Sequence, residues 1–299
     1  MLQYLHFPMK KQTKILLALS LLAFCLILPG LYNALKIVPY SVNAEGITQA
    51  IRIALVTDLH SCDYGDGQRD LLDVLDAQAP DLVLLGGDIF DDELPDDNTL
   101  AFLQGIGGRY PSYYVTGNHE YRSGKEGFAQ KMAALEKWGI VRLSGEMATV
   151  NIKGSRLNIC GVDDAYAWRH ESPYLEHPEG SFEAQIAKVG ALPKNGAYTI
   201  LLIHRPEYLD VYSRYDFDLV LAGHTHGGMW RIPGVLNGLY ANSFYEHSPN
   251  HGLFPALAGG QYEQNGTTMI VSRGLAREST RVPRIYNRPE LVIIDLIPK

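Results

Sequence analysis

From residue 50 onward the chain alternates short β-branched runs with amphipathic segments, and this alternation sets the fold class. Residues 51–57 (IRIALVT) predict a buried strand, residues 68–79 place their leucines on one helical face, and residues 82–85 predict a second strand. A β-α-β beginning of this kind is typical of α/β proteins with parallel strands. We therefore expect an α/β domain built on a sheet.

The same alternation continues to the end of the chain and becomes richer in strands after residue 140. No internal repeat or low-complexity linker interrupts it, so residues 50–299 are expected to form one domain, most simply of two layers around a mixed sheet. Two long segments, 163–180 and 229–266, lack periodicity and are expected to be functional loops. The remaining predicted elements are helices at 96–105, 182–189 and one ending near Gly139, and strands at 113–115, 141–143, 147–152, 156–162, 199–203, 219–222, 269–272 and 291–296.

Composition narrows the function classes. The formal net charge is -7, which argues against a nucleic-acid partner because phosphate backbones are bound by basic surfaces. Three cysteines, Cys25, Cys62 and Cys160, are too few for a disulfide framework and lack zinc-like pairing, so Cys62 and Cys160 are interpreted as structural. The sequence indicates no protein partner.

The N-terminal segment is basic and then apolar. Three lysines precede the run 15–28, which is shorter than the roughly 20 residues that cross a bilayer, but continuation to Val38 reaches that length. We expect a basic N-terminus over 1–14, a transmembrane or signal-anchor segment over 15–38 and a linker over 39–49. A cleaved signal and a buried core helix are the alternatives. The lysine bias predicts a cytoplasmic N-terminus and an extracytoplasmic domain.

Polar motifs follow five of the predicted strands, and they contain five of the ten histidines. Each motif alone is a weak signal, because a polar turn after a strand is common. Their joint occurrence is informative, since ligands bind beyond the carboxyl ends of strands in open sheets. The motifs are Asp58-Leu59-His60, Gly86-Gly87-Asp88, Gly117-Asn118-His119-Glu120, His204 and Gly223-His224-Thr225-His226.

Imidazole, carboxylate and amide groups form a mixed nitrogen and oxygen ligand set, which suits Mn, Fe or Zn better than calcium. Two such ions about 3.5–4 Å apart stabilise the attacking and leaving oxygens of a phosphoryl displacement. One carboxylate must then bridge the two ions.

In these motifs and their order the sequence resembles the calcineurin-like metallophosphoesterases, over about residues 51–297. The resemblance implies a four-layer αββα sandwich of two mixed sheets with two divalent metal ions at strand ends. It also implies two ligand sets that share Asp88 as the bridge. The first set is Asp58, His60, Asp88 and His226, and the second is Asp88, Asn118, His204 and His224.

The resemblance further implies hydrolysis by a metal-bridging hydroxide, with His119 protonating the leaving oxygen or stabilising the charged transition state. It implies that Asp91 holds the His119 ring, although Asp91 begins an acidic run that is also compatible with a solvated loop. The family's phosphatases carry Arg after this second Asp, whereas this chain carries Asp92. A phosphate-binding arginine must come from elsewhere or is absent. Arg122 and Arg205, which adjoin site residues, are the candidates, and an ordinary surface arginine is the alternative for each.

Tail motifs at residues 223–228, 272–275 and 288–291 resemble a membrane-anchored bacterial branch of phosphodiesterases and UDP-diacylglucosamine pyrophosphatases. The bond that is hydrolysed can be a phosphodiester, a phosphomonoester or a pyrophosphate. The substrate can be a small molecule or a lipid-linked envelope phosphate. An outward-facing domain would not meet cytoplasmic nucleotide-lipids. The membrane orientation predicted from the lysines therefore disagrees with the resemblance to UDP-diacylglucosamine pyrophosphatases. The alternative is a non-catalytic, metal-containing scaffold of the same fold.

Overall fold

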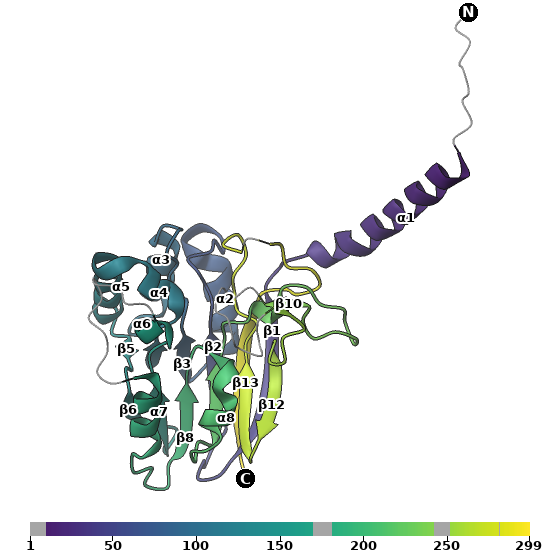
Figure 1. Ribbon diagram of the computed structural model, residues 1–299. Coiled ribbons are helices and arrows are strands. Elements are labelled where there is room, and N and C mark those ends of the chain that lie inside the picture. The colour runs from purple at the N-terminus through teal and green to yellow at the C-terminus, as the bar shows by residue number, and fades with distance from the viewer. Residues whose placement is uncertain (1–9, 170–180, 242–251, 281) are drawn as a thin grey trace, which may run out of the picture.

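Two six-stranded mixed sheets face each other, and helices cover their outer faces (Figure 1). This computed structural model describes residues 10–169, 181–241, 252–280 and 282–299, so parts of both expected functional loops lie outside the described residues. The first sheet has the order β1-β14-β2-β3-β4-β5 and the second the order β12-β13-β9-β8-β7-β6. The α/β prediction and the four layers implied by the family resemblance are confirmed.

The strands of the first sheet are β1 (Lys36–Ala44), β2 (Ile51–Val56), β3 (Leu82–Gly86), β4 (Ser112–Val115), β5 (Val141–Arg142) and β14 (Glu290–Pro298). Those of the second are β6 (Glu146–Ile152), β7 (Ser155–Gly161), β8 (Tyr198–Leu202), β9 (Leu219–Ala222), β12 (Gly260–Gln264) and β13 (Thr267–Val271). Strands β2 to β5 run parallel to one another, as do β7, β8, β9 and β13. Parallel neighbours end at the same edge of their sheet, which brings their following loops together.

The simplest expectation, two layers around one sheet, is wrong because the central strands are buried on both faces. Every residue of β3 and of β8 is buried. One face of each sheet packs between the sheets, where Leu84 and Ile200 belong to one apolar core. The outer face of the first sheet packs under α2 (Arg69–Gln78), α3 (Asp97–Ile106) and α5 (Gly124–Lys137), and that of the second under α7 (Phe182–Gly190) and α8 (Leu209–Tyr212).

Strand β1 occupies residues expected to be anchor and linker. It pairs in parallel with β14 along its whole length, from Lys36 opposite Glu290 to Ala44 opposite Pro298. Val42 and Ala44 are buried, whereas Pro39 is exposed on this edge strand, a position where a missing N–H is tolerated. Residues 39–44 are therefore part of the sheet and not a linker.

The apolar N-terminal segment forms α1 (Lys11–Ile27), continued by a 3-10 turn η1 (Leu28–Leu31), and it extends away from the sheets (Figure 1). The unit Lys11–Leu31 has 21 residues and contains an 18-residue stretch with a mean hydropathy of 2.3, so it is long and apolar enough to cross a membrane. None of the α1 residues is buried, so the alternative of a buried core helix is wrong.

Short elements connect the strands near the predicted site. They are η2 (Asp66–Gln68), α4 (Asn118–Arg122), α6 (Tyr166–Arg169), η3 (Pro206–Tyr208), η4 (His226–Gly228), β10 (Tyr240–Ala241) and β11 (Gly252–Leu253).

Candidate metal centre

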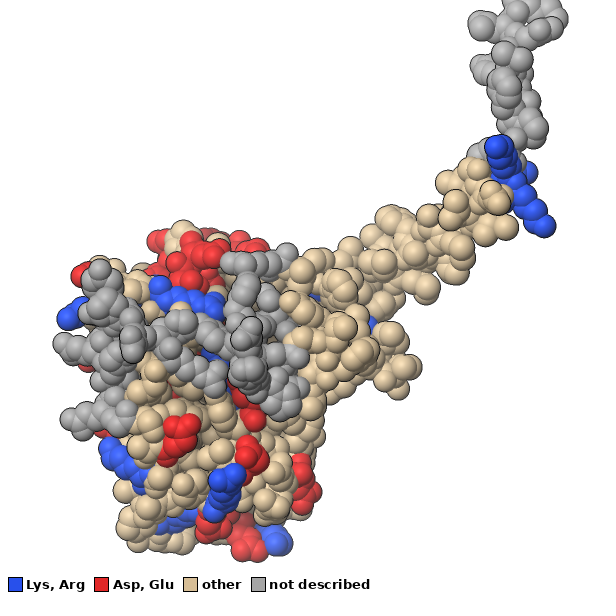
Figure 2. All heavy atoms as spheres, in the orientation of Figure 1, with Lys and Arg blue, Asp and Glu red and all other residues tan. Residues whose placement is uncertain are grey.

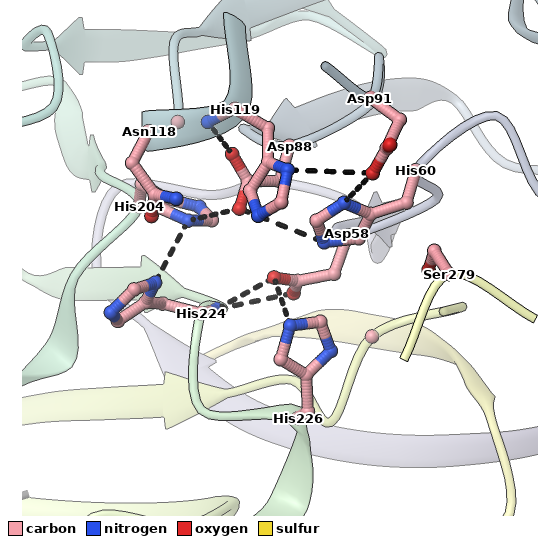
Figure 3. Close-up of polar contacts among 12 residues, drawn as sticks. Asp58, His60, Asp88, Asp91, Asn118, His119, His204, His224, His226 and Ser279 are labelled. Carbon is pink, nitrogen blue, oxygen red and sulfur yellow. Dashed lines mark hydrogen bonds and ion pairs between the residues drawn. The ribbon is translucent and has the colours of Figure 1, made fainter. Parts of the chain in front are cut away.

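The predicted ligands come from loops at the carboxyl ends of β2, β3, β4, β8 and β9, and their side chains turn toward one another (Figure 3). These loops bend sharply, because five of the seven predicted ligands have left-handed backbones. A non-glycine residue adopts this conformation at a cost of about 1 kcal/mol or more, and such strain is concentrated at functional sites. The φ angles are 49° at Asp58, 48° at His60, 50° at Asp88, 73° at His224 and 47° at His226.

The first predicted set gathers Asp58, His60, Asp88 and His226. Nε2 of His226 lies 3.9 Å from Oδ1 of Asp58, and Nε2 of His60 lies 3.6 Å from Oδ2 of Asp88. Nδ1 of His60 donates to Oδ2 of Asp91 at 2.8 Å. That bond holds the ring proton on Nδ1 and leaves the Nε2 lone pair for a metal ion.

The second predicted set gathers Asp88, Asn118, His204 and His224. Nε2 of His204 lies 3.1 Å from Oδ2 of Asp88 and 3.2 Å from Nδ1 of His224. Nδ1 of His204 donates to the Gly86 carbonyl at 2.9 Å, which again leaves Nε2 as a ligand. Asn118 is held at the start of α4, next to the His119 amide that donates to Asp88 at 2.8 Å.

These residues fit divalent metal ions. Nε2 of His60 is buried and has no hydrogen-bond partner among the residues that the structure describes, although a buried polar atom is normally satisfied. Asp58 and Asp88 are both buried, and burial raises the pKa of Asp58. Burial also raises the pKa of Asp88, but the adjacent His204 and His119 rings outweigh it and hold that pKa well below its usual value. Buried carboxylates of this kind are paired or bind metals.

His119 lies at the edge of the ligand groups. Burial lowers its pKa, but Asp88, Asp91 and Asp92 outweigh burial and raise it to about 10. Nδ1 of His119 is 3.4 Å from Asp91 and is in closer contact with Asp92. The Asp91 carboxylate contacts both rings and lies closer to His60 than to His119. Asp92 stands where the family resemblance led us to expect Arg, and it is the nearer partner of His119.

The two predicted substrate arginines differ. Nη1 of Arg122 lies 3.1 Å from Nε2 of His119, and its guanidinium stacks 5.4 Å from the Tyr166 ring. Arg205 is buried, and its guanidinium donates to Asp164 at 2.7 Å and to Glu207 at 3.2 Å. It is therefore built into the site and is not a surface arginine.

Arg205 also contacts two predicted ligands. It donates to Oδ1 of Asn118 at 3.2 Å and to Nε2 of His224 at 2.9 Å. An arginine side chain only donates hydrogen bonds, so Nε2 of His224 is an acceptor in this arrangement. The guanidinium thus places positive charge beside the second set, and Asp164 and Glu207 balance that charge.

Sequence reasoning gave no role to Glu120, although it belongs to a quoted motif. The Glu120 carboxylate is buried and accepts hydrogen bonds from the backbone amides of Asp88, Ile89, Phe90 and Gly117 at 2.8–3.2 Å. It thereby joins the loops after β3 and β4. Its position three residues after Gly117, at the start of a helix, is the available signal.

Two distant residues, Arg284 and Asn287, also support the site. Asn287 donates to the His226 carbonyl at 2.6 Å, and Arg284 donates to the carbonyls of Ala276 and Arg273 at 2.7 and 2.8 Å. Gly274 packs against Asp58, where an added Cβ would lie 2.5 Å from the Asp58 Cβ. Gly274 belongs to the tail motif 272–275, but no spacing rule links Arg284 and Asn287 to the histidines, so sequence reasoning did not identify these two.

The family model for calcineurin-like phosphoesterases matches residues 51–228, which is more than half of the chain. The chain therefore belongs to the calcineurin-like phosphoesterase family.

Relatives agree with the family assignment. An uncharacterized metallophosphoesterase of Helicobacter pylori is 27% identical over 245 residues, covering 78% of this chain, which spans only 61% of that relative. The uncharacterized metallophosphoesterase YkoQ of Bacillus subtilis is 25% identical, with 93% of this chain and 97% of YkoQ covered. Among solved structures, a 5'-nucleotidase precursor from Thermus thermophilus aligns with a TM-score of 0.48 at 18% identity, over 75% of this chain and 49% of that one.

Proposed function

We propose that this protein hydrolyses a phosphate ester or anhydride with two divalent metal ions held by the two predicted sets. The observation that carries the proposal is the place of Asp88, whose Oδ2 contacts His60 of the first set and His204 of the second. A carboxylate between two imidazole groups is what a shared bridging ligand requires. Manganese, iron and zinc all suit these donors.

Metal ions bound here would lower the pKa of water and stabilise the negative charge of the phosphoryl group. The chain's own side chains orient the groups of the site and supply a proton to the leaving oxygen. His119, whose raised pKa reflects three nearby carboxylates, is placed to give a proton to the leaving oxygen. Because Arg122 Nη1 faces Nε2 of His119, this arginine must move before Nε2 carries the donated proton. Asp91 and Asp92 orient the ring through Nδ1.

Arg205 supports the proposal as a positioning residue. Its buried guanidinium holds Asn118 and His224 in place, and it adds positive charge where a phosphate would bind. Arg122, at the end of α4 and partly exposed, is the better candidate for direct contact with the substrate.

We further propose that α1 anchors the protein in a bacterial membrane with the N-terminus in the cytoplasm and the domain outside. Lys10, Lys11 and Lys14 lie at the outer end of an exposed apolar helix, as the positive-inside bias requires. The substrate would then be a lipid-linked or envelope phosphate. A small soluble ester is another candidate, whereas UDP-diacylglucosamine would require a domain that faces the cytoplasm.

One assay tests the activity and the bond type. The full-length chain in detergent, loaded with manganese after chelation, is supplied with an aryl phosphomonoester, an aryl phosphodiester and UDP-diacylglucosamine. We expect turnover of at least one substrate, its loss on chelation and its return with metal. Inactivity on all three with both metals bound would favour the non-catalytic scaffold, and turnover that persists after exhaustive chelation would contradict a metal mechanism.

A further inference from the structure

The topology places the base of α1 at the edge of the sheet that carries the metal ligands. Strand β1 starts at Lys36, which pairs with Glu290 at the start of β14. Strand β14 is antiparallel to β2, with Val292 opposite Leu55 near the end of β2. The chain therefore leaves α1 and enters the domain beside the loop that holds Asp58.

An exposed apolar surface lies next to this helix base. We call it the loop surface and define it by five side chains. Segments 229–240 and 252–258 supply four of these five side chains and contain a single charged residue, Arg231. Figure 2 shows an uncharged protrusion beside the helix. The members and their exposed fractions are Ile232 (53%), Val235 (81%), Leu253 (65%), Phe254 (62%) and Tyr286 (37%).

Hydrogen bonds join the loop surface into one unit with the helix base. The Tyr286 amide donates to the Gly30 carbonyl at 2.7 Å, and its hydroxyl donates to the Leu26 carbonyl. Gly30 is packed so closely that an added Cβ would lie 2.8 Å from Tyr286. The Trp230 indole donates to the Pro283 carbonyl at 3.0 Å, and the Phe254 amide donates to the Leu239 carbonyl at 2.8 Å.

The loop surface is also continuous with the metal centre. His226 opens η4, and residues 229–240 follow directly. Asn287, next to Tyr286 in the chain, donates to the carbonyls of His226 and Met229 at 2.6 and 3.2 Å. The same short tail segment thus contacts α1 on one side and a predicted ligand on the other.

We infer that the loop surface docks into the interface of a lipid bilayer, as a second membrane contact beside α1. Large exposed apolar side chains on segments that hydrogen bond to one another mark a binding surface, and a bilayer is the partner that continues the exposed apolar surface of α1. The docking holds the metal centre at the level of the lipid head groups. It therefore points to phosphate esters of lipid head groups as the substrate class, and it rests on the membrane anchor proposed above.

The test compares two exposed valines in the full-length chain reconstituted in nanodiscs of phosphatidylglycerol and phosphatidylethanolamine. Val235 lies in the loop surface, and Val141 begins β5 at the far edge of the first sheet. Nitroxide labels are placed at Val235→Cys and Val141→Cys in a Cys25→Ser background, because Cys62 and Cys160 are buried. Collisions with oxygen report lipid and collisions with a nickel chelate report water.

We expect the label at position 235 to favour oxygen at least threefold more than the label at 141. Equal accessibility to the nickel chelate at both positions would overturn the docking. A second variant, Val235→Asp combined with Leu253→Asp, should lower turnover of a phospholipid in the nanodisc at least tenfold and leave a soluble aryl ester unaffected. Equal loss on both substrates would also overturn it. If the unmodified chain turns over neither substrate, the proposed activity fails while the label result still decides the docking.

Discussion

The carboxylate of Asp88 reaches histidines of both predicted sets, and the residues around it divide into ligands and supports. His60 and His204 each donate through Nδ1 to a fixed acceptor, Asp91 for one and the Gly86 carbonyl for the other. When the ring is neutral, each bond selects the tautomer that leaves Nε2 available. The site is thus oriented by hydrogen bonds outside the predicted ligand sets.

Replacement of His119 tests its role as a proton donor. We expect His119→Ala to lower kcat about 10²- to 10⁴-fold because the leaving oxygen loses its acid. The metal content, measured by elemental analysis, should stay near that of the unmodified protein. His60→Ala is the comparison and should lose metal. A metal-depleted His119→Ala protein would make His119 a ligand.

Glu120 is predicted to be a structural residue of the site. Glu120→Gln replaces a carboxylate that accepts four backbone hydrogen bonds by an amide with one oxygen, and should lower the free energy of unfolding by about 2 kcal/mol. Chemical denaturation measures this change. Glu126→Gln, on an exposed position of α5, serves as the control and should change it by no more than about 0.5 kcal/mol. Equal stability of the two variants would contradict the role given to Glu120.

At the scale of elements, most of the regular pattern was predictable. Strand β9 begins and ends as expected, and α3 is displaced by one residue, because these elements have clear periodicity. Residues 36–44 and 260–264 form β1 and β12, which periodicity did not identify. Both are edge strands with one exposed face, so their sequences are partly polar and lack a continuous apolar run.

Strand β1 is expected to stabilise the domain. Val42 points into the core between the sheets, and Val42→Asp should lower the free energy of unfolding by about 3 kcal/mol because it buries an unpaired charge. Asn43→Asp adds the same charge at the neighbouring exposed position and should change the free energy of unfolding by about 0.5 kcal/mol or less. Thermal or chemical unfolding of both variants checks this, and an equal effect would mean that β1 does not contribute to the core.

For the whole molecule, metal binding and protonation should be linked. Burial lowers the pKa of His204, but Asp88 and Asp58 outweigh burial and raise it to about 10, so the metal-free protein holds this proton at neutral pH. Its contribution to stability is full below about pH 6.5 and is lost as the pH rises through about 10.

A histidine that binds a metal ion must be neutral, so loading the metal-free protein should release protons. We expect acidification of a weakly buffered solution at pH 7 on addition of manganese, and an affinity that rises about tenfold per pH unit for each proton displaced. The Asp88→Asn variant is the control and should release fewer protons. Metal binding without proton release would contradict the raised pKa of His204.

By itself the sequence determined the α/β class, the strand-end position of the polar motifs and the kinds of ligand atoms, because these follow from local periodicity and side-chain chemistry. Tertiary structure decided that Arg205 is buried against Asn118 and His224, that Asp92 faces His119, and that β1 completes a sheet. It also placed the loop surface beside α1 through the pairing of Tyr286 with Gly30. These contacts join residues far apart in the chain, and only the order and direction of the strands bring them together.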